Sequence, residues 1–149
     1  MLKSRNPEFR EYVEYKIERN RFMHYIGFQL EKVEPGRVEG FLDFEEFHEQ
    51  QNGYLHGGVT GTVADIVMGF AAYTLVAHDE QVFTVESKVN YFRPGVGNRV
   101  RAIGWVEKAG SRFHFCESEI WMESEIGKNT LVAKSNATMA VREKLNGET

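Results

Sequence analysis

The sequence predicts an α+β domain in which a mostly antiparallel sheet curls around one long central helix. Residues 59–77 form an apolar run whose single charged side chain is Asp65. The segments before and after this run alternate apolar and polar residues, which is typical of half-buried strands. A helix that is apolar all round needs walls on several sides, so we expect the strands to wrap it. The length of 149 residues suits a single domain over residues 1–149.

An amphipathic helix is predicted near the N-terminus, over about residues 6–26. Asn6-Pro7-Glu8 combines a capping side chain, a proline at the first helical position and an acidic first turn. Apolar residues then recur at helical spacing among charged ones, namely Phe9, Tyr12, Val13 and Ile17.

Two strands follow, over Phe28–Val33 and Val38–Phe44, and Pro35-Gly36 between them indicates a hairpin. A polar loop, Gln50-Gln51-Asn52-Gly53, leads to the central helix, which begins at about Gly57. Beyond residue 80 the period-two pattern returns. It predicts four more strands, over Val82–Arg93, Arg99–Glu107, Arg112–Met122 and Leu131–Arg142.

Composition excludes several classes of function. The formal net charge is −4 and the basic residues are scattered, which argues against nucleic acid as a partner. Asp65 and several Gly and Thr residues make 59–77 a poor membrane span, and residues 1–5 do not resemble a signal peptide. Cys116 is the only cysteine, so no internal disulfide can form and a cytoplasmic location is expected. No residue spacing matches a metal site or phosphate loop, so neither metal nor cofactor is expected.

His56-Gly57-Gly58, nine residues before Asp65, marks the candidate site. A carboxylate in an apolar helix is costly to bury, so its presence suggests a function. The two glycines lie where the start of a helix presents unpaired N–H groups. Hydrogen-bond donors beside a carboxylate are suited to attack on a carbonyl group.

Several motifs occur together in a fixed order: His56–Val59, Ala64-Asp65, Val82–Val85 leading to Asn90–Pro94, and Leu131–Lys134. In this combination the chain, from about residue 22 to 142, resembles the hotdog-fold thioesterases, specifically the phenylacetate-degradation-like acyl-CoA thioesterases. The resemblance implies a sheet of five to six strands around a long helix, and assembly as a dimer or dimer of dimers. It also implies hydrolysis of acyl-CoA thioesters to free acid and coenzyme A.

The chemistry of hydrolysis assigns roles to two residues. The Gly57 N–H at the helix start would stabilise the oxyanion, and Asp65 would act as general base on water or as nucleophile. Eight residues of helix separate them by about 12 Å, which is too far for one helix to serve one thioester. Two helices packed antiparallel across a two-fold axis would instead join Gly57 of one subunit to Asp65 of the other.

The resemblance suggests supporting roles for further residues. His56 would orient the thioester or brace the loop, Gly58 would line the substrate site beside it, and Thr84 would steer the water. Gln50 stands where several relatives carry an Asn, and Asn52 is the alternative if Gln50 points elsewhere. The phosphates of coenzyme A would meet the side chains of Arg93 and Arg112 and the backbone of Gly110-Ser111.

Simpler interpretations stay open for each feature. Asp65 could face a solvent cleft, and Gly57 and Gly58 could simply allow close helix packing. Strand alternation places Thr84 on the face of Glu86, Lys88 and Asn90, so reaching the site would require a turn near the strand start.

Two other functions compete with hydrolysis: a hydratase or dehydratase on the same fold, and a non-catalytic module that binds or senses acyl-CoA. The position of the acyl group is also open. Val63, Val67 and Met68 are candidates to line an acyl tunnel, together with residues of the facing strands.

Overall fold

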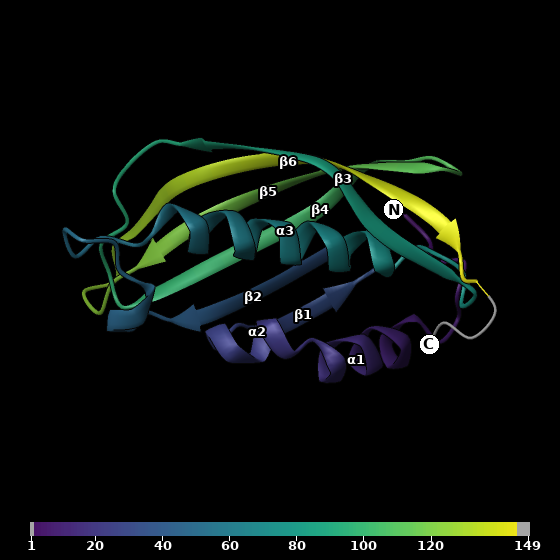
Figure 1. Ribbon diagram of the computed structural model, residues 1–149, viewed down its shortest axis with the longest axis horizontal. Helices are drawn as coiled ribbons and strands as arrows, with labels where there is room; N and C mark the ends of the chain where they lie inside the picture. The colour runs from purple at the N-terminus through teal and green to yellow at the C-terminus, as the bar shows by residue number, and fades with distance from the viewer. Residues whose placement is uncertain (1, 146–149) are drawn as a thin grey trace.

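The computed structural model describes residues 2–145, and Figure 1 shows their arrangement as one curved sheet with a long helix against it. The helices are α1 (Phe9–Arg19), α2 (Arg21–Ile26), the 3-10 turn η1 (Glu46–His48) and α3 (Gly57–Tyr73). The strands are β1 (Gln29–Glu34), β2 (Arg37–Asp43), β3 (Glu80–Tyr91), β4 (Arg99–Ala109), β5 (Phe113–Glu123) and β6 (Asn129–Glu143).

The six strands pair in the order β1-β2-β4-β5-β6-β3, and every neighbouring pair is antiparallel. Strand β3 returns from the end of α3 to pair with β6, so it forms one edge of the sheet. The α+β class, the antiparallel sheet and the central helix are therefore confirmed, with element bounds within a few residues of those expected. No helix within residues 2–145 is long and apolar enough to cross a membrane.

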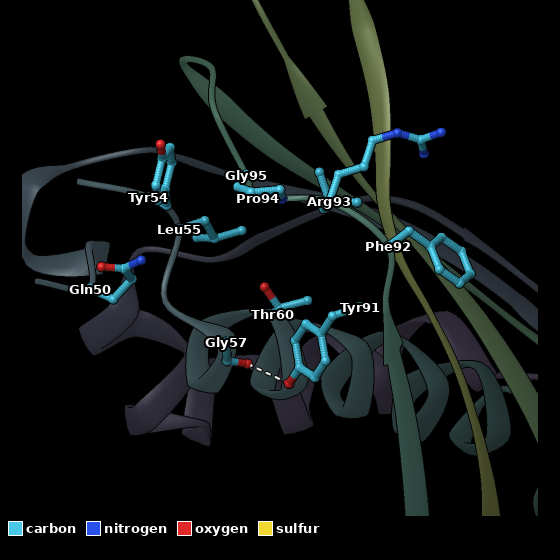
Figure 2. A pocket seen from close by; sticks show the side chains of 11 residues that line it. Gln50, Tyr54, Leu55, Gly57, Thr60, Tyr91, Phe92, Arg93, Pro94 and Gly95 are labelled. Carbon is cyan, nitrogen blue, oxygen red and sulfur yellow. Dashed lines mark hydrogen bonds between the residues drawn. The ribbon is translucent and has the colours of Figure 1, made fainter. Parts of the chain in front are cut away.

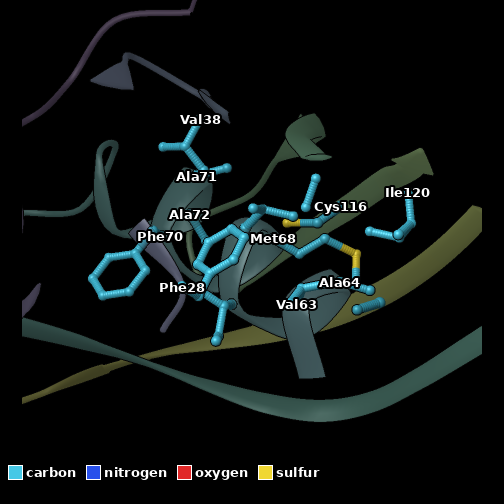
Figure 3. Close-up of a cluster of buried hydrophobic side chains, with 14 of the residues drawn as sticks. Phe28, Val38, Val63, Ala64, Met68, Phe70, Ala71, Ala72, Cys116 and Ile120 are labelled. Atoms are coloured by element: carbon cyan, nitrogen blue, oxygen red, sulfur yellow. The ribbon is translucent and has the colours of Figure 1, made fainter. Parts of the chain in front are cut away.

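The core lies between α3 and the concave face of the sheet (Figure 3). Gly104 of β4 allows the closest approach, because a Cβ there would lie 2.5 Å from the backbone carbon of Val67. Val63, Val67 and Met68 have no exposed surface and belong to this core. The interpretation of these three side chains as the lining of an acyl tunnel is therefore wrong.

The N-terminal segment forms two helices where the sequence suggests one. Helix α1 ends at Arg19, and the Asn20 side chain then caps α2 by accepting a hydrogen bond of 3.0 Å from the Met23 N–H. A new cap inside the apolar pattern therefore divides the predicted helix in two. Helix α2 ends at Gly27, whose φ of 79° is the left-handed conformation that favours glycine.

A β-bulge at Val85 changes the direction of side chains along β3. Thr84 pairs with Met139 of β6, whereas Glu86 pairs with the adjacent Thr138, so Val85 is an extra residue. Met139 is buried against α3, whereas Thr138 is partly exposed on the outer face. The bulge therefore puts Thr84 on the face of α3 and Glu86 on the opposite face.

Candidate active site

The start of α3 is held by His56, its N-cap residue. The backbone of His56 is extended, and its Nδ1 accepts a hydrogen bond of 2.8 Å from the Gly58 N–H. A Cβ on Gly58 would lie 3.0 Å from that nitrogen, so glycine leaves room for the cap. Because Gly58 is used by the cap, the unpaired donor of the first turn is the Gly57 N–H, which has no hydrogen-bond partner within residues 2–145.

Tyr91, at the end of β3, also contacts this turn. Its hydroxyl donates a hydrogen bond of 2.8 Å to the Gly57 carbonyl, and Figure 2 shows the ring reaching across to the helix start. Tyr91 belongs to a sequence motif of the family resemblance, but the motif did not predict a role for it. The pairing of Tyr91 with the inward-facing Ala133 accounts for its direction, and that pairing depends on the bulge.

A cavity of about 520 Å³ opens beside the start of α3. Its lining comes from the loop before α3, the helix start, the end of β3 with the loop that follows it, and one residue of β6. These residues are Gln50, Tyr54, Leu55, Gly57, Thr60, Tyr91, Phe92, Arg93, Pro94, Gly95 and Val132. Two predicted site residues besides Gly57, namely Gln50 and Arg93, are thus brought to one cavity (Figure 2).

Gln50 and Arg93, two of the polar side chains around this cavity, have partners within the chain. Gln50 Oε1 accepts a hydrogen bond from the Asn52 N–H, which folds the loop on itself. Asn52 itself is exposed and does not line the cavity. Arg93 extends away from Gly57 in Figure 2, and its guanidinium donates 3.0 Å to the Leu131 carbonyl.

Asp65 lies two turns further along α3, partly exposed on the face that the sheet leaves open. The Thr84 hydroxyl donates a hydrogen bond of 2.7 Å to Asp65 Oδ1, so the bulged strand places this hydroxyl beside the carboxylate. The second carboxylate oxygen has no hydrogen-bond partner in the described part of the chain. Asp65 can therefore act on a substrate or water through one oxygen while the other is held.

A second cavity, of about 170 Å³, contains this pair. Asn20 borders it from the α1–α2 junction, and the remainder comes from α3, β3 and β6. The complete lining is Asn20, Asp65, Ile66, Gly69, Phe70, Tyr73, Val82, Thr84 and Met139. None of these residues borders the cavity at Gly57, so a single subunit presents the donor and the carboxylate to different spaces.

Three predicted phosphate contacts lie elsewhere. Gly110 and Ser111 line a third cavity with His114, at the turn between β4 and β5, and Arg112 borders none of these three cavities. In Figure 1 this turn lies at the opposite end of the sheet from the start of α3. Within one chain, these residues are not brought to the candidate site.

Two other reactive side chains, Cys116 and His114, are buried. Cys116 is buried, and burial raises its pKa to about 12, so its thiol stays protonated near neutral pH. Burial also lowers the pKa of His114, with Arg5 acting in the same direction. No three His, Cys, Asp or Glu side chains between residues 2 and 145 are grouped to hold a metal ion.

Comparison with known proteins agrees with this architecture. The model of the thioesterase superfamily matches residues 52–127. A 1,4-dihydroxy-2-naphthoyl-CoA hydrolase of Listeria monocytogenes is 30% identical over 119 residues, covering 80% of this chain and 94% of that protein. A medium/long-chain acyl-CoA thioesterase of Salmonella typhimurium is 28% identical over 135 residues, covering 80% of this chain and 84% of that protein.

Solved structures of thioesterases are also similar to this chain. A thioesterase family protein from Silicibacter pomeroyi superposes with a TM-score of 0.89 at 29% identity, covering 91% of this chain and 99% of that one. A Haemophilus influenzae thioesterase superposes with a TM-score of 0.81 over the full length of both chains, and at 19% identity it shows the fold alone. The fold is the hotdog fold, and the chain belongs to the thioesterase superfamily. It is accordingly a thioester hydrolase, as the resemblance predicted.

Proposed function

We propose that this protein hydrolyses acyl-CoA thioesters at a site shared between two subunits. One observation carries the proposal: the Gly57 N–H and the Asp65 carboxylate lie on the same helix but open into different cavities. A thioester carbonyl must lie about 3 Å from both groups. The Gly57 N–H of one subunit therefore needs the Asp65 carboxylate of a second subunit beside it.

The surface around Asp65 suits such a copy. The face of α3 that the sheet leaves uncovered carries Gly58, Gly61 and Asp65 at helical spacing, so a second helix could approach this part of α3 closely. Beside it, the outer edge of β3 is unpaired and carries Phe83 and Val85, which are 46% and 57% exposed. A two-fold axis along this edge would bring Gly57 of each subunit toward Asp65 of the other.

Hydrolysis then follows from the residues in place. Asp65 removes a proton from a water that the Thr84 hydroxyl helps to orient, and the water oxygen attacks the thioester carbonyl carbon. The negative charge on the carbonyl oxygen meets the Gly57 N–H and the positive end of the helix dipole. When the C–S bond breaks, the sulfur leaves with the electron pair and takes up the proton, releasing the free acid and coenzyme A.

Direct attack by Asp65 is the alternative use of the same carboxylate. Its free oxygen would form a mixed anhydride with the acyl group, and water would then hydrolyse the anhydride. Both routes need the same two subunits. ¹⁸O found in Asp65 after a single turnover in ¹⁸O-water would identify the anhydride route, because only attack of water on the Asp65 carbonyl of an anhydride can place the label there.

The proposal that the substrate is a coenzyme A thioester is supported by the relatives of this chain and by the chemistry of the cavity lining. Two relatives are named as hydrolases of CoA thioesters. Arg93 borders the larger cavity and could turn from the Leu131 carbonyl to a phosphate. Gly110, Ser111 and Arg112 lie too far along the same chain, so their contact with phosphates would require another subunit.

Mixed oligomers test the shared site directly. Asp65→Asn removes the base, whereas Gly57→Pro removes the N–H while keeping a residue that is favoured at the first helical position. His56 is already extended, with φ −64° and ψ 133°, as a residue before proline should be. Each variant alone should lose at least about a hundredfold in kcat with acyl-CoA substrates.

Co-expression with two different affinity tags should then restore activity. In a mixed dimer one of the two sites would have both an intact Gly57 and an intact Asp65, so random mixing should recover about a quarter of wild-type activity. No recovery in purified mixed dimers would refute the shared site. Equal turnover by wild type and Asp65→Asn would refute catalysis by Asp65, and binding of acyl-CoA without hydrolysis by the wild type would indicate a non-catalytic module.

A further inference from the structure

The cavity at Asp65 continues along α3 as a narrow chamber. Asp65, Gly69 and Tyr73 follow one another at four-residue spacing on the open face of the helix, so they line one side of it in sequence. Val82 and Met139 form much of the opposite wall and are both buried. The chamber is therefore polar at the Asp65–Thr84 pair and mostly apolar beyond it.

Gly69 forms the open part of this chamber. A Cβ built on Gly69 would meet nothing within 4 Å, so the space over it is free in this chain. A larger side chain at 69 would project into the chamber without displacing any described atom. Glycine at this position thus determines how much room lies immediately beyond the carboxylate.

Tyr73 closes the far end. Its ring contacts the rings of Tyr12 and Phe70 at centroid distances of 6.0 and 6.2 Å, and its hydroxyl donates to the Val82 carbonyl at 3.4 Å. Tyr12 is itself fixed by a hydrogen bond of 2.9 Å to the Glu80 carbonyl. Because α1 and β3 support the tyrosine from different sides, the end of the chamber has a firm wall.

Size and charge assign the two cavities to the two arms of a thioester. The cavity at Gly57 is three times larger, at about 520 against 170 Å³, and Arg93 borders it. A long, anionic coenzyme A arm fits that space better than the smaller one. The chamber beside Asp65 then remains for the acyl group.

We propose that Gly69 and Tyr73 set the length of the acyl group, which extends from Asp65 along α3 and ends at the Tyr73 ring. This inference rests on the proposed hydrolysis of acyl-CoA at Asp65. The volume of 170 Å³ is close to that of an apolar cavity of about 150 Å³ that accommodates benzene. The substrate class is therefore acyl groups of about six carbons, linear or cyclic.

A series of saturated acyl-CoA substrates measures the length of the chamber. With the wild-type oligomer, kcat/KM should rise roughly fourfold per methylene from acetyl to hexanoyl, which corresponds to burial of about 0.8 kcal/mol per methylene. It should then fall by at least about tenfold for decanoyl and palmitoyl. Equal rates from hexanoyl to palmitoyl would show that no wall limits the chain and would overturn the inference.

Two substitutions should move the limit in opposite directions. Gly69→Leu fills the chamber, so the ratio of kcat/KM for hexanoyl over acetyl should fall about tenfold. Tyr73→Ala removes the wall, so the ratio for decanoyl over hexanoyl should rise about tenfold. Tyr25→Ala is the matched control, because Tyr25 is 82% exposed on α2 and should leave both ratios unchanged.

Ratios separate selectivity from loss of folding or assembly, which would lower all substrates together. Sedimentation of each variant checks that Gly69→Leu does not alter the oligomer. If the wild type hydrolyses acyl-CoA but neither variant changes its ratio, only the length inference fails. If the wild type hydrolyses none of the series, the proposed function fails with it.

Discussion

The start of α3 and its middle turn at Asp65 differ in what they contribute and in how they are held. At the start, the useful group is a backbone N–H, fixed by the His56 cap and by the Tyr91 hydroxyl. At the middle turn it is a side chain, fixed by Thr84 from the bulged edge strand. A single helix therefore offers two kinds of chemistry, but only to two different cavities. The separation makes the second subunit a chemical requirement of the proposed site.

Loss of the Gly57 N–H, the backbone donor at the start of α3, should lower activity the most. Gly57→Pro deletes the N–H that would face the oxyanion, and we expect kcat to fall by about 10²–10³ with little change in thermal stability. Gly57→Ala keeps the N–H, and its Cβ would lie 3.5 Å from the Tyr91 ring, an ordinary contact. Steady-state kinetics of both variants measures the difference.

The alanine variant separates the donor from the space around it. If Gly57→Ala loses as much activity as Gly57→Pro, close substrate approach and not the N–H is what glycine provides. Circular dichroism should show the same helix content in both proteins, since a proline at the first helical position is tolerated.

Removing the hydroxyl that holds Asp65 should have a smaller effect. Thr84→Val preserves the shape of the side chain but leaves Oδ1 without its donor, so kcat should fall by roughly ten- to a hundredfold. Thr84→Ser retains a hydroxyl and should recover most of the loss. A serine variant as impaired as the valine one would mean that packing against Met139, which lies 3.4 Å from the hydroxyl, matters more than the hydrogen bond.

Thr84 also shows where reasoning from sequence stops. Alternation along a regular strand places it with Glu86, Lys88 and Asn90, away from α3. The bulge at Val85 reverses this, and it arises from pairing with a strand some fifty residues later. No local sequence pattern predicts a bulge residue. The family resemblance therefore placed Thr84 at the site, whereas the alternation of side chains along a regular strand placed it on the opposite face.

Other features of the molecule also differ in whether the local sequence could predict them. The helix from Gly57 and the strands could be predicted because their periodicity is local and long. Val63, Val67 and Met68 were misplaced, because an all-apolar helix does not reveal which side faces the sheet and which a cavity. The cavities themselves depend on contacts between distant segments, as at Tyr91 and Gly57.

A substitution at the contact between Tyr91 and Gly57 should have the smallest effect on activity, because it removes a single hydrogen bond. Tyr91→Phe keeps the ring against the helix start but removes the hydrogen bond of 2.8 Å to the Gly57 carbonyl. That carbonyl lies in the turn whose N–H would face the oxyanion in the proposed site, so kcat should fall by about three- to tenfold while KM changes little. Tyr54→Phe is the control, since Tyr54 borders the same cavity without a hydrogen bond to α3. If Tyr91→Phe raised KM and left kcat unchanged, the hydroxyl would serve substrate binding, and the start of α3 would hold its geometry through the His56 cap alone.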